Sequence, residues 1–167
     1  ILVVLESLRK DAFTPEVMPH LTRLAERGLQ ANTHYAGSNG SHYGFFSLLF
    51  GRSAINYYPM LEAGVRPRLP TMLGNGGYTN LYITAANLGW VQMDEFLGEQ
   101  DFQVTALASP GRSNWMLDRA VIEEARKQLN DHAGQPVFLV VFAFSTHYDY
   151  SYPDEPEYRV FSPASRP

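Results

Sequence analysis

The chain has 167 residues, 45% of them hydrophobic and 18% charged, which is enough for one folded domain and unlike a disordered segment. Its formal net charge is −4 and it has no run of Lys or Arg, so nothing favours a nucleic-acid partner. It has no cysteine, which excludes disulfides, thiolate metal sites and a cysteine nucleophile.

The chain opens with an apolar run at 1–5 (ILVVL), typical of a strand buried on both faces of a parallel sheet. Thr14 is expected to cap a helix that starts at Pro15, and Gly28 is expected to end it. A second, shorter strand is predicted at 31–36, followed by a tight turn at 37–40.

The middle of the chain is less regular. Crowded apolar residues at 41–50 predict a buried helix, and the Pro-, Tyr- and Gly-containing stretch 52–70 predicts an irregular loop. A short helix at 71–73, a strand at 78–83 and a helix at 90–97 follow.

The last third gives the clearest patterns. After a brief strand at 102–105, residues 113–129 combine an apolar and a charged face, which predicts an amphipathic helix. The stretch 136–145 (PVFLVVFAFS) is the strongest strand. Strands that alternate with helices indicate an α/β layered fold with a largely parallel sheet.

Polar residues follow three of the predicted strands: Glu6 and Ser7 the first, 38–42 the second, and Thr146 and His147 the last. The carboxyl ends of parallel strands meet at one edge of a sheet, where α/β proteins place their chemistry. We therefore expect these groups to lie at one site.

Glu6 directly follows an apolar strand. A carboxylate there is costly unless it is paired or bound to a cation. Its oxygens would suit magnesium, calcium, manganese or zinc. The alternatives are an exposed loop acid or a partner for Arg9.

Ser41 stands at a predicted helix start, where free amides and the helix dipole favour a phosphate or sulfate group. Its hydroxyl could attack such a group if a metal ion lowered its pKa. The alternative is that Ser41 is only a helix N-cap, and Ser38 is a rival hydroxyl. His42 is adjacent to Ser41, but neighbouring residues on a helix point apart.

His147 could bind an anionic oxygen, donate a proton or ligate a metal ion, or it could be a lone surface imidazole. His20, His34 and His132 receive no role.

The sequence resembles the sulfatase-like branch of the alkaline phosphatase superfamily. The likeness is strongest in the first fifty residues, and it includes bacterial inner-membrane members such as lipoteichoic acid synthases and phosphoethanolamine transferases. The segments that carry it are 3–13 (VVLESLRKDAF), 18–21 (MPHL), 34–41 (HYAGSNGS), 46–51 (FSLLFG), more weakly 76–78 (GGY), and 145–147 (STH).

This resemblance implies a three-layer, alkaline phosphatase-like sandwich. It implies that Glu6 is a metal ligand and that Ser41 is both the nucleophile and a ligand of a divalent ion, whose identity (Mn, Mg, Zn or Ca) stays open. His147, Trp90 and Asn39 are the implied substrate-binding residues. The implied substrate is a lipid or glycan that bears a phosphate or sulfate group.

The resemblance further implies that residues 1–167 form the amino-terminal part of one catalytic domain, cut at both ends, with an Asp-His ligand pair further along the chain. Membrane attachment would come from segments outside this chain, with the catalytic domain periplasmic or extracellular. Ser41 lacks the Pro and Arg of the Cys/Ser-x-Pro-x-Arg sulfatase motif, which argues against oxidation to formylglycine. A catalytically silent binding or regulatory module is the alternative function.

Overall fold

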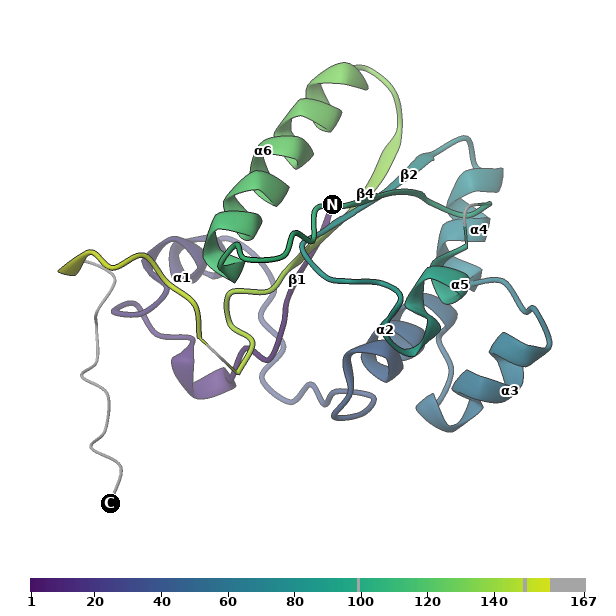
Figure 1. The fold of residues 1–167 in the computed structure, drawn as a ribbon, viewed down its shortest axis with the longest axis horizontal. Coiled ribbons are helices and arrows are strands. Elements are labelled where there is room, and N and C mark those ends of the chain that lie inside the picture. Colours follow the sequence, from purple (N-terminus) through teal and green to yellow (C-terminus); the bar gives the residue numbers. More distant parts are fainter. Residues whose placement is uncertain (99, 149, 157–167) are drawn as a thin grey trace.

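The computed structural model describes residues 1–98, 100–148 and 150–156. Four strands form one parallel sheet in the order β1-β4-β2-β3, with helices packed on both of its faces (Figure 1). The predicted α/β class and parallel sheet are confirmed. The strands are β1 Leu2–Leu5, β2 Thr79–Thr84, β3 Gln103–Ala106 and β4 Val137–Ala143.

Two helix layers enclose the sheet because its central strands are apolar on both faces. Helix α6, Asn114–Asp131, covers one face of β2 and β4 through its buried residues Leu117, Val121 and Ala125. Helices α2, Ser41–Phe50, and α5, Met93–Leu97, cover the other face. Alternate residues of β2 point to opposite faces of the sheet, so Leu81 and Ile83 pack on the α6 side and Tyr82 on the α2 side.

The register brings the carboxyl ends of the strands to one edge. Leu5 pairs with Ala143, and Thr84 pairs with both Phe142 and Ala106. The ladder continues one residue past β1, where the Glu6 amide donates to the Ala143 carbonyl at 3.0 Å.

The predicted strand at 31–36 is wrong. All six residues are exposed and none belongs to the sheet. A strand in a layered fold needs a buried face, and this segment has none. The polar stretch 38–42 reaches the sheet edge through a loop that runs into α2.

The predicted helix start at Thr14 is also wrong. Helix α1 spans Pro19–Ala25, with Pro19 at its first position. A helix that ran from residue 15 would place Pro19 in its interior, where the ring clashes with a preceding carbonyl. Met18 accordingly has non-helical dihedrals, φ −131° and ψ 62°. The C-cap is Glu26, not Gly28.

The stretch predicted as a loop at 52–70 is largely helical. It contains the 3₁₀ turn η2, Ala54–Asn56, the helix α3, Tyr57–Glu62, and the start of α4, Arg68–Asn75. Pro59 and Pro70 each lie in the first turn of a helix, where an amide N–H has no helical partner to lose.

The remaining short elements are two 3₁₀ turns, η1 at Lys10–Ala12 and η3 at Trp90–Gln92. Val91 and Gln92, within η3, have left-handed dihedrals, so the helix predicted at 90–97 is interrupted before α5 begins at Met93. Among the described residues, no helix is both long and apolar enough to cross a lipid bilayer.

Candidate active site

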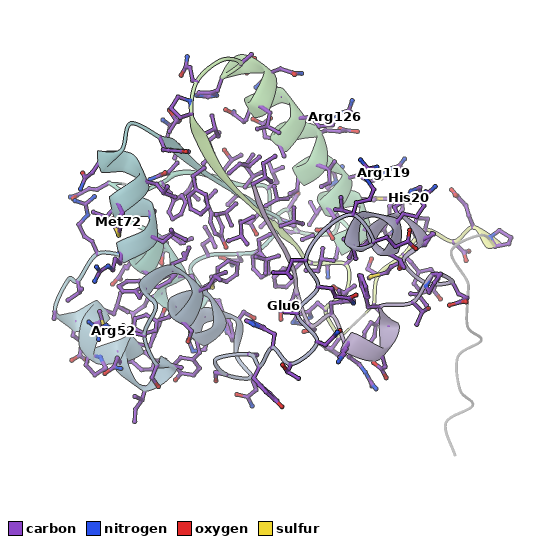
Figure 2. All side chains as sticks on the ribbon, turned by 180° about the vertical axis from the view of Figure 1, so that it is seen from behind. Glu6, His20, Arg52, Met72, Arg119 and Arg126 are labelled. Carbon is purple, nitrogen blue, oxygen red and sulfur yellow. The ribbon has the colours of Figure 1, made fainter. Side chains whose placement is uncertain are left out.

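Glu6 lies immediately beyond β1, near the centre of the molecule and where the strands end (Figure 2). Ser7 has a left-handed backbone, φ 55°, which turns the chain away from the sheet, and its hydroxyl donates to Glu6 Oε1 at 2.9 Å. The Glu6 carbonyl accepts a hydrogen bond from the Thr146 hydroxyl. The backbone of Glu6 is therefore fixed by the end of β4.

Arg9 does not pair with Glu6. Its guanidinium donates through Nε and Nη2 to the two carboxylate oxygens of Asp11, at 2.9 and 2.5 Å. The alternative role of Glu6 as a partner for Arg9 is therefore wrong, because a nearer carboxylate occupies both donors.

Ser41 is the first residue of α2, and the N-cap is Gly40, with extended dihedrals of φ −120° and ψ 138°. The alternative role of Ser41 as an N-cap is therefore wrong. The first four amides of a helix have no intrahelical acceptor. Ser41 therefore lies at the amino-terminal end of a ten-residue helix, where unpaired amides carry partial positive charge.

Glu6, Asn39 and Ser41 line one cavity of about 640 Å³. The loop before α2 forms one wall, and the end of β1 with Ser7 forms another. Ser38 also lines this cavity, and its hydroxyl donates to Asn39 Oδ1 at 3.4 Å. Three of the predicted site residues are thus brought together.

Trp90 lies outside that lining and contacts His42, the residue after Ser41. Its side chain is 57% exposed and meets the ring of His42 edge to face, with 5.4 Å between the ring centroids. His42 is buried and also contacts Tyr43 and Tyr57, at centroid distances of 3.9 and 5.1 Å. Burial lowers the pKa of His42, so this imidazole is neutral at neutral pH.

His147 also lies outside the cavity lining, in the turn that follows β4. Its ring stacks on Phe144, with 5.0 Å between centroids and 16° between planes. Its link to the site is the preceding residue, since Thr146 holds the Glu6 carbonyl.

The charge of Glu6 is felt inside the core. Burial, and then the charge of Glu6, raise the pKa of the Tyr82 phenol, so this fully buried side chain stays protonated. Tyr82 lies on β2, two strands away from Glu6 in the sheet.

The donor set of the cavity suits part of a divalent-metal site. A carboxylate and a hydroxyl are hard oxygen donors of the kind that magnesium, manganese or calcium accept. Within the described part of the chain, no three His, Asp or Glu side chains form a group that could hold a metal ion. Glu6 and Ser41 would therefore supply a fraction of a coordination shell.

His34, for which no role was predicted, lines the same cavity as Glu6 and Ser41. It sits in the exposed segment that was predicted to be a strand. No periodicity marks such a loop residue, so only the path of the chain reveals its position.

A family model described as Sulfatase matches residues 1–166. The chain is also 28% identical over 160 residues to a curated protein named phosphoglycerol transferase I, from Citrobacter koseri. That match covers 83% of this chain and 21% of the relative, so the chain spans about a fifth of the relative's length.

Proposed function

Since the chain belongs to the sulfatase family, we propose that it carries the nucleophile and part of the metal site of a phosphoester hydrolase or phospho-group transferase. One observation carries this proposal. A serine hydroxyl at the start of a ten-residue helix shares a cavity with the carboxylate that follows the first strand.

Ser41 Oγ acts as the nucleophile. Its attack on phosphorus forms the Oγ–P bond while the bond from phosphorus to the leaving oxygen breaks. The hydroxyl proton passes to solvent, and the product is a phosphoseryl enzyme. Water or an acceptor alcohol then takes the phospho group, which makes the protein a hydrolase or a transferase.

The start of α2 stabilises the charge that develops on the phosphoryl oxygens. Its unpaired amides point toward the space before Ser41, and they are fixed before the reaction begins. Gly40 leaves room for the His42 ring beside this helix start, since a Cβ at residue 40 would lie 3.1 Å from His42 Cε1.

Glu6 and Ser41 would hold the divalent ion, together with further ligands. The bound ion supplies Lewis-acid charge and lowers the pKa of a coordinated hydroxyl. His147 binds an anionic oxygen of the substrate or protonates the leaving oxygen, and Asn39 and Trp90 contact the rest of the substrate.

The substrate class follows from the relative's name and from the cavity. A phosphoglycerol transferase handles a phosphate ester of a polyol, and an open cavity with amide, hydroxyl and imidazole groups suits the same chemistry. We therefore propose a phosphate-bearing lipid or glycan as substrate. The likeness to bacterial inner-membrane proteins supports an extracytoplasmic membrane surface as the place of the reaction.

The test uses the full-length protein and bis(p-nitrophenyl) phosphate. We expect the wild type to bind one or two divalent ions and to cleave the diester, with chelation abolishing turnover. Ser41→Ala should lower kcat by about a thousandfold or more. Glu6→Gln should lower both metal content and turnover.

Two matched variants control for general damage. Ser38→Ala removes the other hydroxyl of the same cavity, and Glu16→Gln neutralises an exposed carboxylate; both should retain turnover. Loss of turnover in Ser38→Ala but not in Ser41→Ala would transfer the nucleophile to Ser38. If the wild type binds no metal and Ser41→Ala does not change turnover, the silent binding module becomes the better account.

A further inference from the structure

The carboxylate of Asp118, on α6, accepts four hydrogen bonds from the end of β4. The Phe144 amide donates to Oδ1 and Oδ2 at 2.8 and 2.9 Å. The Ser145 amide and hydroxyl both donate to Oδ2, at 2.6 and 2.5 Å. These two residues come just after the strand, where the sheet ladder no longer provides acceptors.

The turn fixed by Asp118 is also tied to β1. Thr146, the residue after Ser145, donates its hydroxyl to the Glu6 carbonyl. The segment 144–146 is therefore held on one side by Asp118 of α6 and on the other by Glu6, the proposed metal ligand.

His147 ends this segment, and its orientation depends on it. The His147 amide donates to the Phe144 carbonyl at 3.0 Å, which closes the turn. Its ring stacks on the Phe144 ring. Since Asp118 binds the amide of Phe144, a shift at Asp118 moves both the start of the turn and the ring on which His147 rests.

The position of Asp118 on its helix is unusual for an acid. It lies seven residues before the buried Ala125, so both are on the face of α6 that packs on the sheet. Backbone amides without an acceptor at a strand end could donate to water or to a neutral side chain. A carboxylate makes shorter and stronger hydrogen bonds, which hold one geometry.

We propose that Asp118 is a positioning residue, which sets the His147-bearing turn against the carbonyl of Glu6. This inference rests on the proposed function, because Asp118 acts through His147. Asp118 touches neither the substrate nor the reacting atoms.

The test compares Asp118→Asn with Asp131→Asn in the full-length protein, using bis(p-nitrophenyl) phosphate. Asp131 is an exposed acid at the other end of the same helix, so the two substitutions are chemically identical. We expect Asp118→Asn to lower kcat/KM by about 10- to 100-fold, with metal content unchanged. Asp131→Asn should match the wild type, and equal values for the two variants would overturn the proposal.

A double-mutant cycle with His147→Ala separates positioning from general stability. If Asp118 acts through His147, Asp118→Asn should change kcat/KM by less than about twofold in the His147→Ala background. A purely structural role would produce the same loss in both backgrounds, and that outcome overturns the proposal.

A milder variant keeps the test decisive if Asp118→Asn does not fold. Ser145→Ala removes one of the four hydrogen bonds. It should lower kcat/KM in the wild type and not in the His147→Ala background; equal losses in both overturn the proposal.

The assay also separates the two proposals. If the wild type is active, Ser41→Ala is inactive and Asp118→Asn is fully active, the positioning role fails alone. If the wild type has no turnover, both proposals fall.

Discussion

Gly37, in the loop before α2, has no room for a side chain. A Cβ at this residue would lie 2.3 Å from Ser47 Oγ and 2.6 Å from Ser47 Cβ. The loop that carries Asn39 toward Ser41 therefore rests directly on the second turn of α2. The fit is close enough that Ser47 Oγ is buried without a hydrogen-bond partner among the described residues.

Gly37→Ala should force this loop away from α2. We expect it to lower the free energy of unfolding by about 1–3 kcal/mol, and to reduce turnover because Asn39 moves. Gly44→Ala is the matched control, since a Cβ there meets nothing within 4 Å. Inside a helix it should raise the free energy of unfolding by up to about 1 kcal/mol. Chemical denaturation of both variants measures the difference, and equal midpoints would contradict the steric argument.

At the scale of elements, Asp101 joins α4 to the sheet. Its carboxylate, 6% exposed, accepts from Arg66 Nε and Nη2 at 2.9 and 2.6 Å and from the Thr71 hydroxyl at 2.8 Å. Asn80 of β2 donates to the Asp101 carbonyl at 2.9 Å and to the Pro70 carbonyl at 2.8 Å. This network anchors the first turn of α4 to β2 and to the residues before β3.

Asp101→Ala should lower the free energy of unfolding by about 1–3 kcal/mol, because it removes a buried carboxylate that accepts hydrogen bonds from Arg66 and Thr71. Asp11→Ala removes the carboxylate of the Arg9–Asp11 pair, whose side chains are 72% and 66% exposed. That variant should leave the melting temperature unchanged, since solvent screens an exposed pair. Similar melting temperatures for the two variants would refute this distinction.

The elements that could be predicted are those whose pattern of apolar and polar residues shows which faces are buried. The apolar run of β4 and the two-faced pattern of α6 specify burial directly, and both were placed within two residues of their observed bounds. The stretch 52–70 could not be read in this way. Its prolines looked like helix breakers, and only the start position of each helix makes them compatible with α3 and α4.

At the scale of the whole molecule, the order β1-β4-β2-β3 makes β4 the only partner of β1 in the described sheet. Leu5 pairs with Ala143. The cost of closing so long a loop must be met before that pairing stabilises the fold. Strands β2 and β4 are much closer in sequence, with η3, α5, β3 and α6 between them.

We therefore expect β1 to join the sheet last. In pulse-labelled hydrogen exchange during refolding, the amides of Val4 and Leu5 should gain protection no earlier than those of Val140 and Val141. The amide of Tyr82 in β2 serves as the internal control and should gain protection together with the amides of β4. Protection of β1 before β4 would contradict this order.

The candidate site was predictable only in its general location. The rule that α/β sites lie beyond the carboxyl ends of strands predicted that Glu6, Ser41 and Asn39 lie close together. All three line one cavity, even though the expected strand at 31–36 does not exist. The contact from Thr146 to Glu6 spans 140 residues and depends on strand order. No local pattern encodes that order.

The position of β4 between β1 and β2 also has a consequence for biosynthesis. During translation, at roughly 5–20 residues per second, β1 leaves the ribosome about 7–27 seconds before β4. Throughout that interval its apolar residues have no strand to pair with in this sheet. The nascent chain therefore exposes an apolar, aggregation-prone strand, which a holding chaperone or an early membrane contact would have to shield.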